Sequence, residues 1–303
     1  MNSLISPQAY ECFSQLADVA PKRYAVSIDD LSMTFTEQSR KWSKPDSHNT
    51  PERMAQSLFD AKFSQATKTD VAALKVSLIA RLAIKTPGLV ETENFPDQIL
   101  AYYPAAFDRL ATALKKSVDQ SPDTASILFH KIGFVLAINI PCGAQLLDLR
   151  SSIPWSSAVL SVYRERSVKS LARYVGCRGV GVWFRGHTDT EYLDEFNEAG
   201  WDRFYLRIAE LLLRRKDVRG LVGTSWFYDP QLSSISPQIA YLQQRQLERG
   251  AFLMRHRALE SDVVFATKTS STRRNLYHEG KYIPVSHSLV WGRNEILSWA
   301  NKF

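Results

Sequence analysis

The sequence predicts an α/β (α+β) protein in which a mainly helical N-terminal part, residues 1–175, precedes a mixed sheet with crossing helices, residues 176–303. Three observations favour this class. Apolar residues recur at helical spacing through the first half, short alternating β-rich runs follow residue 176, and segments with helical periodicity separate those runs. Hydrophobic residues make up 45% of the chain, enough for a buried core, and we expect the two parts to pack as one unit.

The composition narrows the classes of partner and compartment. The net charge is +7, but Lys and Arg are spread along the chain, so nucleic acid is not an expected partner. Cys12, Cys142 and Cys177 are too few and too far apart for a disulfide framework or a metal site, so no metal is expected and Cys142 is predicted to be a buried thiol. The N-terminus lacks a signal peptide, and the most apolar run, residues 132–140, is about half the length that crosses a bilayer. We therefore expect a cytoplasmic protein without a membrane span, whose oligomeric state the sequence does not specify.

Helices dominate the predicted first half. Residues 21–50 are polar and interrupted by proline, which predicts a loop over the surface. Apolar side chains then recur at i, i+3, i+7, i+8 and i+11 from Val71, which predicts a helix that ends at Pro87-Gly88. Further helices are predicted from Pro104 and over residues 155–174.

The second half alternates predicted strands and helices. Strands are predicted at residues 180–184, 220–227, 252–256, 263–266 and 283–291. Helices are predicted at residues 191–198, 201–212, 237–245, 272–278 and 294–300, and the second of these carries an apolar stripe from Trp201 to Leu212. This order indicates a mixed sheet with helices crossing between its strands.

The segment Arg219–Pro230 is the most informative part of the chain, because a β-rich run ends abruptly there on polar and aromatic side chains. Loops at strand ends carry functional residues more often than strand interiors do. We expect Trp226, Tyr228 and Asp229 to face a common cleft that receives a small-molecule substrate.

A second candidate site lies in Thr269-Ser-Ser-Thr-Arg-Arg274. This run combines hydroxyl groups, a predicted helix start and two guanidinium groups, which are the groups that hold a phosphate or carboxylate. Thr272, Arg273 and Arg274 are therefore candidate anion contacts. The alternative interpretation is a helix cap followed by two surface arginines.

The predicted strand 263–266, the helix with Asn275-Leu-Tyr277, the segment Glu279-Gly-Lys-Tyr282 and the closing strand follow one another near the C-terminus. This order resembles the C-terminal unit of the GNAT acyltransferase superfamily, over less than a third of the chain. In that family an Asn-x-x-Ala-x-x-Leu-Tyr-x-x-x-Gly-Phe pattern precedes the last strands, and its Tyr often protonates the departing thiolate. The resemblance implies that Tyr277 is this acid, and that the strand ending at Tyr228 holds the acyl-CoA thioester at its splayed end.

The same resemblance places a pyrophosphate loop, Arg/Gln-x-x-Gly-x-Gly/Ala, between that strand and its helix. The corresponding segment here is Gln231-Leu-Ser-Ser-Ile-Ser236, which has no glycine. Without glycine, backbone N–H groups approach a phosphate less closely. Ser236 either contacts the cofactor or caps the helix that begins at Pro237.

A different chemistry is suggested by His187-Thr-Asp189, which has the His-x-Asp spacing of iron- and 2-oxoglutarate-dependent oxygenases. In that interpretation His287 is the distal ligand and Arg293 anchors the oxoacid. In the alternative, Thr188 or Asp189 caps the helix that follows.

The leading hypothesis is transfer of an acyl group from a thioester, an acyl-CoA or an acyl carrier, to an amine of a small molecule. Its candidate catalytic residues are Tyr277, Tyr228 and Asp229. Candidate donor contacts are Ser236, Thr272, Arg273 and Arg274, and candidate substrate contacts are Trp226, His187 and Asp189. The competing hypotheses are the iron-dependent oxygenase and a non-enzymatic module that binds a ligand or a protein.

Overall fold

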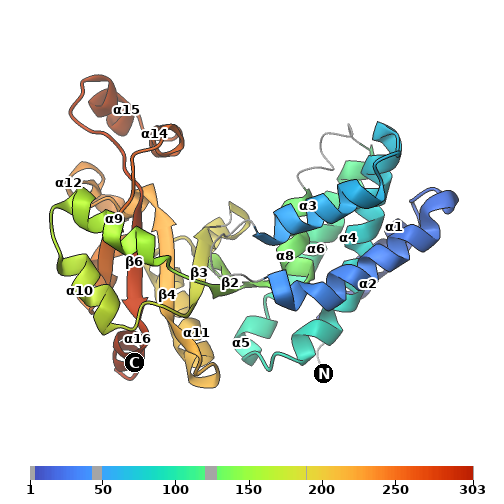
Figure 1. The fold of residues 1–303 in the computed structure, drawn as a ribbon, viewed down its shortest axis with the longest axis horizontal. Helices are drawn as coiled ribbons and strands as arrows, with labels where there is room; N and C mark the ends of the chain where they lie inside the picture. The colour runs from blue at the N-terminus through green and yellow to red at the C-terminus, as the bar shows by residue number, and fades with distance from the viewer. Residues whose placement is uncertain (1–3, 43–49, 120–127, 189, 303) are drawn as a thin grey trace. The chain divides into compact units, whose positions relative to one another are not determined.

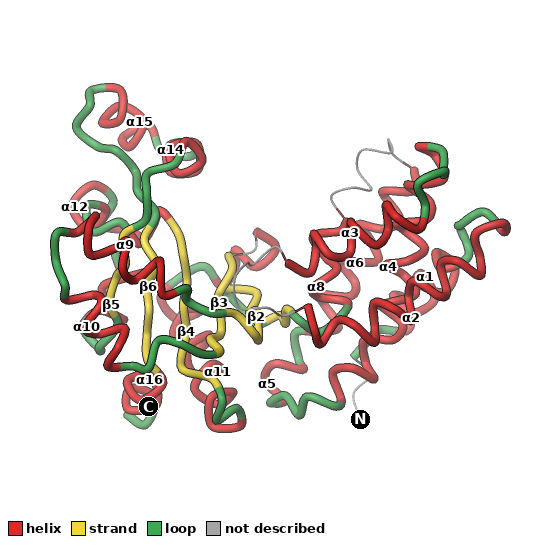
Figure 2. Tube along the Cα trace, viewed as in Figure 1, coloured by secondary structure: helices red, strands yellow, loops and turns green. Residues whose placement is uncertain are grey.

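The computed structural model describes residues 4–42, 50–119, 128–188 and 190–302. The chain forms two compact units, Met1–Cys142 and Gly143–Phe303. Figures 1 and 2 show that the first unit is mainly helical, whereas the second has a sheet interleaved with helices. This arrangement confirms the predicted α/β class, while the domain limits expected at residue 175 stay a prediction. Within the described residues, no helix is both long and apolar enough to cross a membrane.

The first unit is built around α4 (Lys68–Glu91), which packs against α1, α2, α6 and α8. The apolar stripe predicted for this helix is confirmed, because Leu74, Leu78, Ile79 and Leu82 are buried. The other elements are α1 (Pro7–Ala17), α2 (Ala25–Trp42), α3 (Thr50–Lys62), α5 (Asp97–Leu100), α6 (Tyr103–Asp119), α8 (Ile132–Val135), β1 (Asn139–Pro141) and 3-10 turns at Lys22–Tyr24 and Leu128–Lys131. Cys142, at the end of this unit, is buried as predicted.

Most of the surface loop predicted for residues 21–50 is wrong, because residues 25–42 form helix α2. Ile28, Leu31 and Phe35 recur at i, i+3 and i+7 and are buried, so this segment has a core-facing side. The Ser, Thr and Asp residues between them make the run look polar. The helical period was therefore present but was masked by the composition.

The predicted end of α4 at Pro87-Gly88 is also wrong, since the helix continues to Glu91. Proline removes one N–H donor from a helix, but packing on both sides can hold the turn. The Thr86 hydroxyl donates to the carbonyl oxygens of Leu82 and Val135, at 3.0 and 2.7 Å, and Val90 is buried in the following turn. These contacts anchor the helix on either side of Pro87.

The sheet has six strands in the order β1-β2-β3-β4-β6-β5. Its strands in the second unit are β2 (Gln145–Ser151), β3 (Val182–Thr188), β4 (Val218–Ser225), β5 (Phe252–Arg255) and β6 (His287–Gly292). β3 and β4 are parallel, whereas β2 with β3, β4 with β6 and β5 with β6 are antiparallel. Four of these five strands overlap predicted ones, and β2 was not predicted.

Helices cover the sheet and fill the connections of the second unit. The longer ones are α9 (Trp155–Glu165), α10 (Lys169–Gly176), α11 (Glu198–Arg214) and α16 (Arg293–Ala300). The shorter ones are α12 (Leu232–Ile235), α13 (Tyr241–Leu247), α14 (Glu260–Thr267) and α15 (Ser271–His278), with 3-10 turns at Thr190–Glu195, Trp226–Tyr228 and Pro237–Ile239. The single helix predicted over residues 155–174 is instead two helices, because Arg166 adopts a left-handed conformation with φ of 51° after α9. The helix predicted at residues 191–198 is wrong, because this segment forms only a 3-10 turn that ends at Glu195, whereas the one predicted at 237–245 begins as a 3-10 turn and continues as α13.

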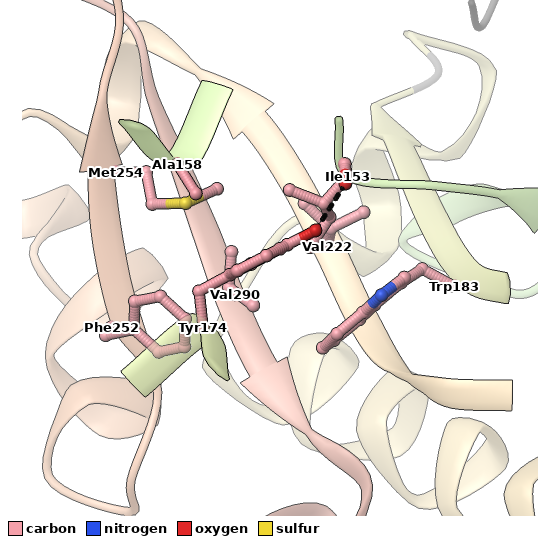
Figure 3. Close-up of a cluster of buried hydrophobic side chains, with 8 residues drawn as sticks. All are labelled: Ile153, Ala158, Tyr174, Trp183, Val222, Phe252, Met254 and Val290. Carbon is pink, nitrogen blue, oxygen red and sulfur yellow. Dashed lines mark hydrogen bonds between the residues drawn. The ribbon is translucent and has the colours of Figure 1, made fainter. Parts of the chain in front are cut away.

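A buried apolar cluster fills one face of the sheet beneath α9 and α10 (Figure 3). It consists of Ile153, Ala158, Tyr174, Trp183, Val222, Phe252, Met254 and Val290. The two polar atoms of its largest members are satisfied: Tyr174 Oη donates to the Ile153 carbonyl oxygen and Trp183 Nε1 to that of Gly179, both at 2.8 Å. On the other face, the predicted stripe of α11 is buried, and Tyr205 packs edge-on against Trp291 of β6 with centroids 5.2 Å apart.

The strand predicted at residues 263–266 is wrong, because this segment lies in helix α14. Asp262 is the reason: its carboxylate accepts from the backbone N–H of Leu259 and from Ser286, and so fixes the first turn of the helix. Val264 and Phe265 are exposed, so their β propensity is not used for packing. One element of the resemblance to the GNAT superfamily is thereby replaced by a helix.

A β-bulge lies at the start of β4. Val182 pairs with Val218, but the next pair joins Phe184 to Leu221, so β4 holds one residue more than β3 over this stretch. Gly220 supplies the extra residue and has φ of 151°. A Cβ atom at this position would lie 2.2 Å from the carbonyl oxygen of Trp291 on β6, a backbone atom that cannot move freely.

We expect Gly220→Ala to lower the free energy of unfolding by about 2 kcal/mol or more, because the added methyl group clashes with β6 and φ becomes unfavourable. Gly88→Ala in α4 is the control: nothing lies within 4 Å of its added Cβ, and stability should rise by about 0.5–1 kcal/mol. Denaturant unfolding followed by tryptophan fluorescence measures both. Equal effects of the two substitutions would contradict the assignment of the bulge.

Candidate functional site

The two parallel strands separate at their carboxyl ends. The last residues that pair β3 with β4 are Gly186 and Gly223. Beyond them, β3 stays paired with β2 as far as Thr188, and β4 stays paired with β6 as far as Ser225. The sheet therefore opens between the ends of β3 and β4, at the edge where parallel strands of α/β proteins place their ligand sites.

Two buried side chains close one side of this opening. A Cβ atom at Gly223 would lie 2.8 Å from the hydroxyl oxygen of Tyr228, and one at Gly186 would lie 1.9 Å from Oε1 of Gln145. Only glycine thus allows these side chains to reach the strands. Burial raises the pKa of Tyr228 far above its usual value, and the hydrogen bond with Gln145 opposes this shift only in part. Tyr228 is therefore a neutral phenol at the opening.

A chain of polar side chains crosses the opposite side of the sheet at the same level. Arg185 Nη1 donates to Thr224 Oγ1 at 3.2 Å, and Thr224 Oγ1 lies 2.7 Å from Ser288 Oγ. Ser288 Oγ lies in turn 2.7 Å from Nε2 of His256. We call Thr224, Ser288 and His256 the relay. Thr224 is its exposed end, and Ser288 is buried.

The protonation of His256 gives the relay a direction. Burial lowers the pKa of His256 to about 4, with further lowering by the charges of Arg164, His287 and Arg185, so the imidazole is neutral near pH 7. Arg185 can only donate, so the Thr224 oxygen accepts from it, and with Nε2 unprotonated the Ser288 hydroxyl donates to Nε2 and the Thr224 hydroxyl to Ser288. The relay thus connects an exposed hydroxyl group to a buried imidazole that is neutral near pH 7.

A pocket of about 370 Å³ begins directly after β4. Its apolar walls are Phe196, Trp226, Phe227, Ile239 and Leu242. Its polar groups come from Gln238, Thr269, Ser270 and Arg273. Trp226 and Arg273 were both predicted site residues, and the structure brings them together although 47 positions separate them in the sequence.

Arg273 is held in place by uncharged partners. Its guanidinium group lies 4.9 Å from the centre of the Trp226 ring, Nη1 donates to Ser236 Oγ at 3.0 Å, and Nε donates to the carbonyl oxygen of Ala266. Arg273 is 5% exposed and Ser236 2% exposed. Burial lowers the pKa of Arg273, but a guanidinium stays charged in proteins. Ser236 caps no helix through its side chain, so its hydroxyl serves this contact.

Tyr228, the last residue of the turn that begins at Trp226, and Asp229, which follows it, are buried at 3% and 2% exposure. The Asp229 carboxylate accepts from the backbone N–H groups of Gln231 and Val285, at 3.1 and 3.2 Å. It also raises the pKa of the neighbouring Tyr282, after the larger effect of burial. Asp229 thus joins the end of β4 to the segment before β6, and its contacts are those of a residue that holds the loop.

The remaining predicted residues of α15 do not line the pocket. Thr272 and Arg274 are exposed, and Arg274 Nη2 donates to the carbonyl oxygens of Thr267 and Lys268, both at 3.2 Å. Tyr277 is 36% exposed, and its ring lies beside that of His278. Arg273 therefore lines the pocket, whereas Thr272, Arg274 and Tyr277 do not.

The proposed metal ligands fall on different strands. His187 lies on β3, paired with Leu146, whereas His287 lies on β6 with Nδ1 donating to the Val285 carbonyl oxygen at 3.0 Å. Arg293 donates through Nη1 to the carbonyl oxygen of Arg215, at 2.9 Å, at the start of α16. Asp189 lies outside the described residues. Within residues that are described, no group of three or more His, Cys, Asp or Glu side chains is arranged to hold a metal ion.

The sequence did not indicate Gln145, Arg185, Ser288 or His256 as site residues, and Thr224 lies in the segment Arg219–Pro230 without any feature that marks its role. Gln145 belongs to the unpredicted strand β2. Alternation along β3 and β4 would have placed Arg185 and Thr224 on the same face as Trp183 and Val222 once the pairing was known. Comparison with known proteins adds nothing to this geometry, because no family model, curated protein or solved structure matches the chain.

The low pKa of His256 predicts how stability depends on pH. Between pH 6.5 and about 4 the unfolded chain binds a proton on this residue that the folded protein does not, so the free energy of unfolding falls as the pH falls through this window. We expect the wild type to lose about 3 kcal/mol more than His256→Gln between pH 7 and pH 4. Urea titrations at each pH measure this. His278→Gln, at an exposed histidine, is the control, and parallel profiles for wild type and His256→Gln would refute the assignment.

Proposed function

We propose that the second unit transfers an acyl group from a thioester to an amine of a small molecule, with the thioester held between the diverging ends of β3 and β4. The observation that carries this proposal is the end of the β3 to β4 pairing at Gly186 and Gly223 while both strands continue. The resemblance to the GNAT superfamily implied a splayed strand end for the acyl donor. The divergence found next to Tyr228 supports that implication independently of the local sequence pattern.

The opening suits an extended, amide-containing arm such as those that carry the thioesters of acyl-CoA and acyl carriers. Two neighbouring strand edges that no longer pair with each other can receive such a chain in the manner of an added strand. Gln145 and Tyr228 fill the space beside Gly186 and Gly223 on one face, so the donor reaches the free strand edges beyond these glycines. We therefore propose an acyl-CoA or an acyl carrier as the donor.

Acyl transfer to an amine requires a group that accepts the proton of the amine, and we assign this role to the relay. The amine nitrogen attacks the thioester carbonyl carbon, a C–N bond forms, and the C–S bond breaks with its electron pair leaving on sulfur. The proton lost by the amine passes through Thr224 and Ser288 to the neutral His256, whose low pKa makes it a transient carrier that returns the proton to water. Arg185 holds the Thr224 hydroxyl in position and is itself held by Ser151 and Ser152.

The thiolate that departs needs a proton, and Tyr228 is better placed to supply it than Tyr277. The Tyr228 hydroxyl lies against Gly223 at the opening, and its raised pKa keeps it protonated. Tyr277 lies exposed on α15, away from the β4 turn contacts described above. We therefore transfer the role of acid from Tyr277, which the resemblance implied, to Tyr228.

Donor binding and thiol release test the proposal directly. A thermal-shift panel of short, medium and long acyl-CoAs should raise the melting temperature of the full chain, and thiol release with a panel of amines should follow. Thr224→Val should lower kcat by about 100-fold, because the proton path is interrupted. Thr112→Val, an exposed position on α6, should leave kcat unchanged. If no acyl-CoA raises the melting temperature and none releases thiol, acyl-CoA transfer is rejected.

The choice of acid is tested by comparing two tyrosines. Tyr228→Phe should lower kcat by about 10- to 100-fold with a smaller change in KM, because the phenol acts on the leaving thiolate. Tyr277→Phe should change kcat less than twofold. The opposite ranking would return the role to Tyr277, and a loss of folding in Tyr228→Phe would be seen as a lowered melting temperature before the rates are compared.

A further inference from the structure

The pocket after β4 contains a buried positive charge that no acidic side chain neutralises. Arg273 makes its two hydrogen bonds to a hydroxyl and a carbonyl oxygen, and within the described residues it forms no ion pair with a carboxylate. Its Nη2 makes no hydrogen bond to any described residue. A charge held at 5% exposure is costly unless it is paired, so an anion that reaches Nη2 would be bound favourably.

The walls of the pocket specify what kind of anion would complete it. Trp226 offers a ring face, and Phe196, Phe227, Ile239 and Leu242 add apolar surface on the remaining sides. Among the described residues that line the pocket, Arg273 is the single cation. One guanidinium balances one negative charge, which a carboxylate carries, whereas a phosphate monoester or a pyrophosphate carries more and would need further donors.

We propose that this pocket binds a small carboxylate that bears an aromatic ring, with the carboxylate on Arg273 and the ring against Trp226 and Phe227. The volume of about 370 Å³ is in the range of small-molecule sites. The carboxylate accepts from Nη2, and the polar side chains of Thr269 and Gln238 lie along the same walls. Binding of this ligand does not require acyl transfer, and it assigns Arg273 a ligand other than the anionic groups of an acyl donor.

Isothermal titration of the full chain with phenylacetate, 3-phenylpropionate and indole-3-acetate tests the inference. At least one should bind saturably, and the matching amide, for example phenylacetamide, should bind about tenfold or more weaker because it has no charge for Arg273. Acetate and inorganic phosphate should displace the bound ring-bearing carboxylate only at concentrations about tenfold or more above its own, since neither ion fills the space between the apolar walls. Failure of all three ring-bearing carboxylates to bind would overturn the proposal, and so would displacement by phosphate at equal concentration.

Matched arginine variants locate the site. Arg273→Gln should weaken binding of the best carboxylate about tenfold or more, while Arg274→Gln, one residue along α15 and exposed, should change it less than twofold. Trp226→Leu should weaken the binding of the ring-bearing carboxylates, while the binding of their amides should stay weak. If Arg273→Gln does not fold, the affinities of the wild-type protein for the carboxylate and for the matching amide still test whether a negative charge is required. Equal binding by Arg273→Gln and wild type would show that the carboxylate binds elsewhere.

Discussion

The parallel pairing of β3 with β4 is the constraint on which the second unit depends. Each strand is also paired on its outer side, β3 with β2 and β4 with β6, so a change in this register would shift four strands. The register places Trp183 and Val222 on the face that forms the core. It places Arg185 and Thr224 farther along the same face, where the core gives way to polar side chains. One pairing therefore positions both the apolar cluster and the relay.

Elements with strong local signals could be predicted from the sequence. The stripe of α11 and that of α4 consist of large apolar residues at regular spacing, and each of those helices buries them as expected. The strand before Trp226 could also be predicted, although the predicted range 220–227 ends two residues beyond Ser225, where the strand stops. Of the candidate site residues, Trp226 and Arg273 line one pocket and Ser236 accepts a hydrogen bond from Arg273, because each lies near the end of an element, where side chains converge.

Features that depend on distant partners could not be predicted in the same way. Ser288 meets Thr224 across 64 positions and His256 across 32, and nothing in the local sequence of any of the three marks that contact. The segment around Val264 has the composition of a strand, yet Asp262 caps it as a helix by bonding to Ser286, 24 positions away. In both cases a tertiary hydrogen bond overrides or adds to the local preference. Arg274 has the same side chain as Arg273, but its guanidinium group donates to backbone carbonyl groups at the surface and does not line the pocket.

Gly186 and Gly223, at the end of the parallel pair, contribute no side chains to the opening. Its width is set by Gln145 from β2 and by Tyr228 from the turn after β4, which reach it from separate parts of the chain. Substitutions at either position would change the size and polarity of the space while leaving the strands and their pairing intact. The shape and polarity of the opening can therefore be altered through single side chains that lie outside the paired strands β3 and β4.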